Sequence, residues 1–397
     1  MNKEKIKSIF KTIIQFIFNP RLLLCLGLGW IITNGWSYIM FVLGSYFGIG
    51  WMIAVSGSYM AFLWFPFTPE KIITIIIAIT LLRLLFPNDT KTLAILKKLH
   101  EKAKNALNNR KNISQEERKR KRKKRIIILS SLATIVIVVA VWIGWGNKAL
   151  MITEITVVDD RIPESFEGFR IAQISDLHNA LFGEDNEKLL EMLKQARPDI
   201  IVITGDLIDA NRTNVHISAD FCEKALDLAP VYFVTGNHEA GALNKYKDLK
   251  NRLTNMGVQI LEENFEIIEK NGEKLCIAGI SDPGFLPEFS SELEKLMIET
   301  SEFYTVLLSH RPELIHEYKN YGAELVLTGH AHGGQIRVPF IGGLMAPGQG
   351  AFPDYDAGLY QEGTTRMIVS RGLGNSRFPF RVNNRPEIVV AVLSAGQ

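Results

Sequence analysis

The chain reads FRIAQISDLH at residues 169–178 and IIVITGD at residues 200–206. Each stretch begins with the residues of a strand and ends in a carboxylate or imidazole side chain. The second strand is apolar at four consecutive positions, which is typical of a sheet covered on both faces. The residues between them, 187–196, place three leucines on one face of a helix. Strands and helices therefore alternate here, as in a layered α/β domain.

The same alternation continues to the end of the chain and defines a predicted domain over residues 151–397. Further strands are predicted at 231–235, 258–261, 265–269, 275–279, 304–309, 325–328, 367–370 and 388–393, with helices at 221–228 and 243–256. In sheets of this kind, ligand sites lie at the carboxyl ends of the strands.

Five of these strands run directly into polar residues of the kind that bind metals. These residues are Asp176 and His178, Asp206, Asn237 and His238, His310, and His330 and His332. Such side chains are costly to bury without partners, so packing does not explain their positions. Five of the eight histidines belong to this set, whereas His100, His216 and His316 have no ligand-type neighbours in sequence. Clustered His and Asp at strand ends indicate a functional site.

The order and spacing of these motifs resemble the calcineurin-like metallophosphoesterases. The series is Asp-x-His, Gly-Asp, Gly-Asn-His-Glu, His and Gly-His-x-His, with Asp206 following Asp176 by 30 residues. The ending GHAHGGQ at 329–335 and SRGLG at 370–374 look most like the membrane-associated YaeI/YkuE-like branch. The resemblance covers about residues 150–395 and implies a layered β-sandwich flanked by helices.

The resemblance also implies two metal ions and their ligands. One ion is held by Asp176, His178, Asp206 and His332, and the other by Asp206, Asn237, His310 and His330. Asp206 would bridge both ions, and His238 would be the catalytic histidine. Mixed nitrogen and oxygen ligands favour divalent Mn, Fe, Zn or Co.

Such a site implies hydrolysis of a phosphoester by attack of a metal-bridging hydroxide. The YaeI/YkuE-like branch favours a phosphodiesterase, and the apolar first half of the chain suggests a lipid-linked, cell-envelope or nucleotide-sugar phosphoester near the bilayer. The alternative is a non-enzymatic membrane scaffold or receptor that uses the fold to bind a partner. That alternative predicts the loss of a ligand or of His238, and neither is seen.

An arginine-rich segment follows the last motif. Arg371 is a candidate for binding a distal phosphate, because Arg suits bidentate phosphate contacts. The alternative is that the arginines at 371, 377, 381 and 385 are solvated loop side chains, with Phe378 and Phe380 as packing anchors.

The apolar composition of residues 1–87 predicts a membrane module in this part of the chain. Residues 22–65 carry no charge and are long enough for two spans, whereas 72–86 is a short apolar run containing Arg83. Residues 6–17 have the spacing of an interfacial amphipathic helix. We therefore expect two or three hydrophobic segments before residue 88. They would be α-helical transmembrane segments that precede the α/β domain.

A basic linker and a further span follow. Residues 88–125 contain fifteen Lys or Arg against four Asp or Glu, and residues 126–146 form an uncharged run. The positive-inside rule places the linker in the cytoplasm. The predicted localisation is thus the cell membrane, multi-pass, with the catalytic domain extracytoplasmic. Nucleic acid is not an expected partner, because the basic block abuts a span and lacks interleaved aromatics.

Overall fold

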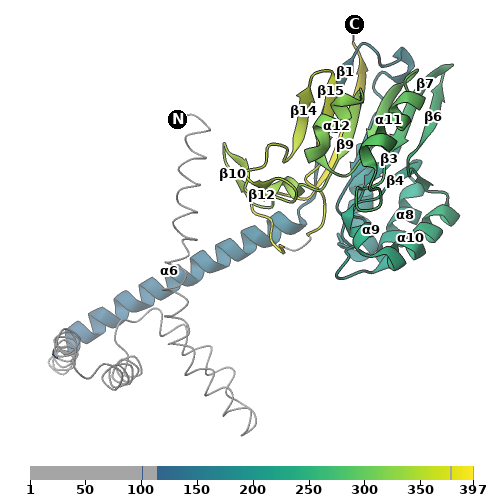
Figure 1. Ribbon diagram of the computed structural model, residues 1–397. Helices are drawn as coiled ribbons and strands as arrows, with labels where there is room; N and C mark the ends of the chain where they lie inside the picture. Colours follow the sequence, from purple (N-terminus) through teal and green to yellow (C-terminus); the bar gives the residue numbers. More distant parts are fainter. Residues whose placement is uncertain (1–100, 102–113, 376–377, 397) are drawn as a thin grey trace, which may run out of the picture. The chain divides into compact units, whose positions relative to one another are not determined.

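The structure is a computed structural model, and it describes residue 101 and residues 114–375 and 378–396. Element labels follow Figure 1. The predicted segments 6–17, 22–65 and 72–86 lie outside the described residues. The chain divides into two compact units, Met1–Thr134 and Ile135–Gln397.

One long helix, α6 (Gln115–Lys148), contains the predicted span 126–146. It begins inside the segment expected to be a linker, so the eight basic residues 118–125 are helical. Its isoleucines and valines from Ile126 to Val141 are 42–67% exposed. Among the described residues, α6 is the one helix long and apolar enough to cross a membrane.

Two six-stranded mixed sheets form the body of the second unit (Figure 1). The first has the order β1-β16-β2-β3-β4-β5, with β16 antiparallel to β2 and the other neighbours parallel. Its strands are β1 (Met151–Asp159), β16 (Glu387–Ala395), β2 (Arg170–Ile174), β3 (Ile200–Thr204), β4 (Val231–Val234) and β5 (Gln259–Ile260).

The second sheet has the order β14-β15-β9-β8-β7-β6, parallel from β15 to β7 and antiparallel at both edges. Its strands are β14 (Gly358–Glu362), β15 (Thr365–Val369), β9 (Leu325–Thr328), β8 (Tyr304–Leu308), β7 (Glu273–Gly279) and β6 (Asn264–Lys270). Two small hairpins follow β9, made of β10 (Arg337–Val338) with β11 (Gly342–Gly343) and β12 (Met345–Ala346) with β13 (Gly350–Ala351).

Three apolar clusters hold the layers together. The central one joins the facing sides of the two sheets, for example Val202 of β3 and Val306 of β8. The outer clusters bury the other faces under helices. The helices are α7 (Glu187–Ala196), α8 (Val215–Leu226), α9 (Asn237–Gly241), α10 (Leu243–Met256), α11 (Phe289–Glu299) and α12 (Ile315–Asn320). In Figure 1, α11 and α12 lie over the sheet that contains β9. The predicted α/β domain with helix-flanked sheets is confirmed.

Local sequence signals account for several helix ends. In α8, the side chain of Asn214 accepts a hydrogen bond from His216 N and caps the helix, although the helix begins six residues before the predicted start. In α10, Gly257 adopts a φ of 100° and ends the helix with an N–H bond to Thr254 O, so the predicted bounds are matched. Within the described part of the chain there are also four short 3₁₀ turns, namely η1 (Glu164–Phe166), η2 (Glu184–Asn186), η3 (Pro312–Leu314) and η4 (His332–Gly334).

Candidate metal centre

The polar residues predicted from the sequence meet between the two sheets. The parallel strands β2, β3 and β4 bring the loops after residues 174, 204 and 234 to one edge of the first sheet. The parallel strands β8 and β9 bring His310 and the loop 329–334 to the corresponding edge of the second sheet. Both edges therefore supply side chains to the same space.

One group consists of Asp176, His178, Asp206 and His332. Their ligand atoms all lie within 4.8 Å of one another, and all four residues are buried. His178 Nε2 is 3.2 Å from His332 Nε2 and 3.6 Å from Asp206 Oδ2. His332 Nε2 is 3.4 Å from Asp176 Oδ1. These atoms converge on one point.

A second group shares Asp206 with the first. Asp206, His310 and His330 offer ligand atoms within 4.8 Å of one another. His310 Nε2 lies 3.3 Å from Asp206 Oδ2 and 3.2 Å from Asn237 Oδ1. His330 Nδ1 is 3.2 Å from His310 Nε2. The structure thus brings all seven predicted ligands together, with Asp206 common to both groups.

The donor chemistry of these groups fits divalent cations. Burial, the largest influence, lowers the pKa of His178 and that of His332 to about 3, so both rings are neutral. His310 donates its Nδ1 proton to Thr204 O at 2.7 Å, which directs Nε2 into the site as a lone pair when the ring is neutral. Facing lone pairs 3.2 Å apart repel one another unless a cation or proton lies between them. Nitrogen and carboxylate oxygen in this mixture suit first-row divalent transition metals.

Asp206 and His310 shift the pKa values of each other. Burial is the largest influence on each and disfavours charge. It acts to raise the pKa of Asp206, but the neighbouring imidazoles, His310 first, hold that pKa well below its usual range. It acts to lower the pKa of His310, but the charge of Asp206 and their hydrogen bond raise it to about 10. The Asp206 carboxylate thus remains ionised, and without a metal the positive charge beside it is the protonated imidazole of His310.

Five of the candidate ligand residues have a left-handed backbone conformation. Asp176, His178, Asp206, His330 and His332 have φ angles of 50°, 48°, 51°, 63° and 48°. Non-glycine residues rarely adopt this left-handed region, and it persists where the surrounding structure enforces it. The strand exits are therefore held in a conformation that aims these side chains inward.

Glu239 holds these loops in place, a role that was not predicted from the sequence. Its buried carboxylate accepts three backbone N–H bonds, from Asp206 at 2.9 Å, Gly236 at 2.8 Å and Ile208 at 3.0 Å. Burial first, and then the charge of Asp206, raise its pKa to about 7. Glu239 therefore ties the loop after β3 to the loop after β4. Three backbone donors converging on one carboxylate cannot be read from residue types.

His238 lies beside the first group. Its ring centroid is 4.4 Å from that of His178, and Asp209 offers a ligand atom within 4.8 Å of both rings. Ala210 N donates to His238 Nδ1 at 3.0 Å, so Nδ1 is an acceptor and a neutral ring carries its proton on Nε2. The backbone N–H of His238 donates to Asp206 Oδ1 at 2.8 Å, which leaves Oδ2 to face His178 and His310.

Arg371 is not in contact with these groups. Its Nε lies 3.4 Å from Glu387 Oε2, and its backbone N–H donates to Glu387 Oε1. Arg381 is instead completely buried and donates to Arg371 O at 2.9 Å and to Gly374 O, with Nη2 3.5 Å from His332 Nδ1. The alternative of solvated loop arginines is therefore wrong for Arg381. The packing role expected for Phe378 and Phe380 is also wrong, because they are 44% and 48% exposed.

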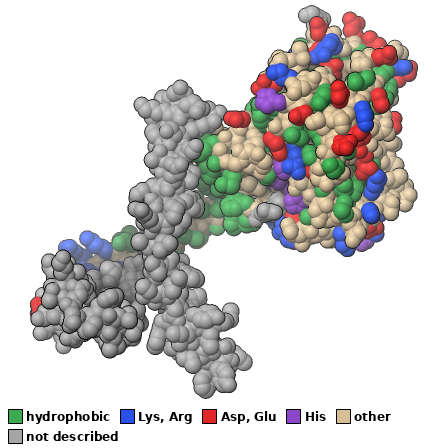
Figure 2. Space-filling view, in the orientation of Figure 1, with side chains coloured by type: hydrophobic (Ala, Val, Ile, Leu, Met, Phe, Trp, Pro, Cys, Tyr) green, Lys and Arg blue, Asp and Glu red, His purple; other side chains and the backbone are tan. Residues whose placement is uncertain are grey.

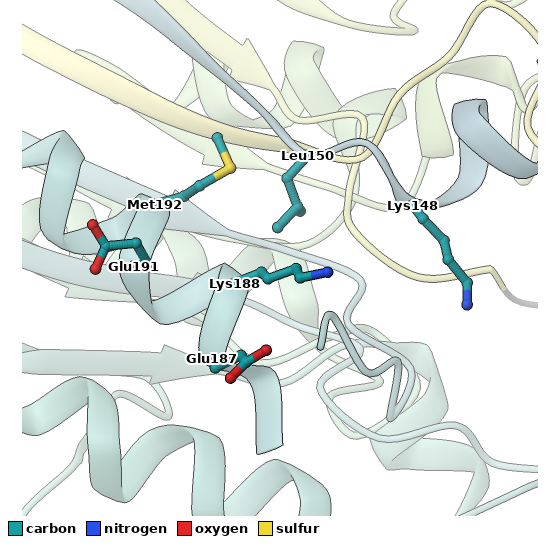
Figure 3. Close-up of a pocket in the computed structure, with 6 residues that line it drawn as sticks. All are labelled: Lys148, Leu150, Glu187, Lys188, Glu191 and Met192. Carbon is teal, nitrogen blue, oxygen red and sulfur yellow. The ribbon is translucent and has the colours of Figure 1, made fainter. Parts of the chain in front are cut away.

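None of the candidate metal ligands lines a separate pocket of about 550 Å³, which Figure 3 shows. It is lined by Lys148, Leu150, Glu187, Lys188, Glu191 and Met192. It joins the end of α6 to α7 and contains none of the clustered His or Asp residues. Because it mixes both signs of charge and holds no group of the candidate centre, we do not assign the chemistry to it.

Gly236 provides a test of the geometry. A Cβ atom at this position would overlap Asp206 Oδ1 and lie 2.5 Å from Asp206 N. We expect Gly236→Ala to displace Asp206 and to remove most of the bound metal, as measured by plasma mass spectrometry of the purified protein. Gly241→Ala is the control, because its Cβ would lie 3.3 Å from Ala210 Cβ and needs only a small adjustment. Equal metal content in the two variants would contradict the proposed arrangement.

Comparison with known proteins agrees with this geometry. The family model for calcineurin-like phosphoesterases matches residues 169–334. The chain is 34% identical to the uncharacterized metallophosphoesterase YkuE of Bacillus subtilis, over 61% of this chain and 85% of that protein. It is 25% identical to phosphodiesterase YaeI of Escherichia coli, over 57% of this chain and 82% of that protein. It is 27% identical to a Danio rerio transmembrane protein with metallophosphoesterase domain, over 61% of this chain and 57% of that protein. The chain therefore belongs to the calcineurin-like metallophosphoesterase family and is a metal-dependent phosphoesterase.

Proposed function

We propose that the protein is a membrane-anchored phosphodiesterase with a dinuclear metal centre. The observation that carries this proposal is the contact of one carboxylate, Asp206, with both groups of converging nitrogen and oxygen atoms. The first ion would be held by Asp176, His178, Asp206 and His332, and the second by Asp206, Asn237, His310 and His330. Two ions held there would neutralise the phosphoryl charge and lower the pKa of bound water.

Neighbouring residues hold the candidate metal ligands in position and orient their side chains. Ser175 Oγ donates to Asp176 Oδ2 at 2.7 Å and fixes that carboxylate. Thr204 O and Glu239 fix His310 and the Asp206 loop. His238 is assigned as the proton donor to the leaving oxygen, because the Ala210 N–H occupies Nδ1 and leaves the ring proton on Nε2.

A similar protein and the candidate membrane helix bear on the substrate class. The similarity to a protein named phosphodiesterase YaeI favours a diester. We propose a lipid-linked, cell-envelope or nucleotide-sugar phosphoester, because a candidate membrane helix directly precedes the catalytic domain. The non-enzymatic scaffold has no support, since no ligand is replaced and His238 is present.

The membrane arrangement is likewise a proposal. The domains would be a membrane module at 1–87, a basic cytoplasmic linker at 88–125, a span at 126–146 and the enzyme at 151–397. The basic block before the apolar part of α6 supports an enzyme on the side of the membrane away from the cytoplasm. The uncharged run 22–65 supports a multi-pass protein.

The metal and proton roles make different predictions for two variants. We expect the full chain with Mn²⁺ to hydrolyse bis-p-nitrophenyl phosphate, and Asp206→Ala to lose both metal and activity. His238→Ala should keep its metal while kcat falls roughly 10²- to 10⁴-fold, the usual contribution of a general acid. Undiminished hydrolysis by Asp206→Ala would refute the proposed centre.

Arg371 stays a predicted contact for a distal phosphate. If it has this role, Arg371→Ala raises KM while kcat is kept, and Arg371→Lys gives an intermediate KM because it retains charge without the paired donors. A purely structural role through Glu387 would instead lower the melting temperature and leave KM unchanged. Steady-state kinetics and thermal unfolding of both variants separate these outcomes.

Topology is tested with reporter fusions. Alkaline phosphatase fused after residue 397 should be active and green fluorescent protein at the same position should be dark, because the enzyme is proposed to lie outside the cytoplasm. Fusions after residue 125 should show the opposite pair of signals. A fluorescent fusion after residue 397 would place the enzyme in the cytoplasm and reverse the proposed orientation.

A further inference from the structure

Two phenylalanine side chains are exposed on the segment that follows the metal-site loops. Phe378 and Phe380 are 44% and 48% exposed, and their ring centroids are 5.9 Å apart. Near the end of α6, Trp142 and Trp145 are 43% and 52% exposed. Figure 2 shows hydrophobic surface gathered where α6 meets the catalytic domain. Exposed aromatics grouped in this way mark an interaction site.

Hydrogen bonds fix the phenylalanine segment to the last turn of α6. Asn147 Oδ1 accepts from Asn375 Nδ2 at 2.7 Å and from the backbone N–H of Arg381 at 3.2 Å. Arg385 Nε donates to Ala149 O at 2.8 Å, and its guanidinium lies 5.0 Å from the centroid of the Trp145 ring. The segment is therefore attached to the helix end on both sides of Phe378 and Phe380.

This attachment determines what can cover the two rings. If the exposed apolar residues of α6 up to Val141 lie in a bilayer, Trp142 and Trp145 reach the headgroup level, where tryptophan is enriched. The residues bonded to Asn147 then meet the same interface. The surface continues directly from a candidate span, which argues for lipid as its occupant over a soluble protein.

The same segment reaches the metal site. Arg381 directly follows Phe380 and donates to Arg371 O and Gly374 O, while its Nη2 is 3.5 Å from His332 Nδ1. A Cβ on Gly374 would overlap Leu177 O and lie 3.1 Å from Asp176 O, so this loop packs directly on the first metal group. Phe378 and Phe380 thus lie in sequence between Gly374 and Arg381, the two residues that contact the first metal group.

We propose that Phe378, Phe380, Trp142 and Trp145 form an interfacial patch that seats in the membrane surface. The substrate is accordingly a phosphodiester whose apolar part stays in that membrane while its phosphate enters the metal site. This inference rests on the proposed phosphodiesterase function and on α6 as a span.

The seating is measured without reference to activity. The background is full-length protein carrying Cys25→Ser. In it, Phe378→Cys is labelled with a nitrobenzoxadiazole fluorophore, and the protein is reconstituted in phosphatidylcholine vesicles. The label should emit at a shorter wavelength than the same fluorophore exposed to detergent-free buffer. Spin-labelled lipid should quench it. The other two cysteines, Cys222 and Cys276, are buried. Ile298→Cys is the matched control, because Ile298 is 65% exposed on α11, which Figure 1 shows far from the end of α6. Equal quenching at the two positions would overturn the patch.

The substrate class is tested with two diesters that share one leaving group. Phe378→Ser with Phe380→Ser should leave hydrolysis of soluble bis-p-nitrophenyl phosphate unchanged. The same pair should lower hydrolysis of the p-nitrophenyl ester of dioleoylphosphatidic acid in vesicles by about tenfold, because two half-exposed aromatic rings lose their interfacial contacts. Ile298→Ser should change neither rate.

The outcomes separate the two proposals. No hydrolysis of either diester by the wild-type protein means that the phosphodiesterase function has failed. Hydrolysis of the soluble diester with no preference for the lipid diester, or an equal loss on both after the double substitution, overturns the membrane-substrate inference alone. Circular dichroism of the double variant distinguishes a folding defect from a lost contact, since an unfolded protein would also lose the soluble activity.

Discussion

The position of the Asp206 carboxylate is the constraint on which the site depends. One oxygen accepts the backbone N–H of His238, and the other faces the imidazoles of His178 and His310. Each of the two groups of candidate ligands combines residues from the ends of both sheets, and this side chain is the member that the two groups share. A displacement of this carboxylate would therefore disturb both groups at once.

Burying these carboxylates costs free energy when no cation is bound, and a bound cation would offset that cost. Asp176 and Asp206 are both buried in the same cluster of candidate ligands, and burial alone disfavours their charged forms. The two sheets surround these carboxylates. The hydrogen bonds of Glu239 and the five residues with left-handed backbone hold the surrounding loops in place. Strain and desolvation of this kind are maintained where binding of a cation offsets them.

The sequence predicted the strand ends well and the supporting contacts poorly. Apolar runs such as 200–204 identify buried strands, and parallel strands necessarily end at one edge, so the side chains after them could be expected to meet. The role of Glu239 depends on the direction of backbone N–H groups in loops, which residue types do not specify. Arg381 is buried and Phe380 exposed because of how one loop packs on the helix end, the reverse of their usual preferences.

The short connection between α6 and the sheet limits where the enzyme can act. α6 ends at Lys148 and β1 begins at Met151, so only residues 149 and 150 join them. A connection of this length spans about 7 Å even when fully extended. Residue 150 is buried, and Arg385 donates hydrogen bonds to the carbonyls of Ala149 and Leu150, so the connection is also fixed. A catalytic domain joined to α6 in this way is not carried on a flexible tether. If α6 spans a membrane as proposed, the phosphoesters accessible to this domain are those that come to the membrane surface.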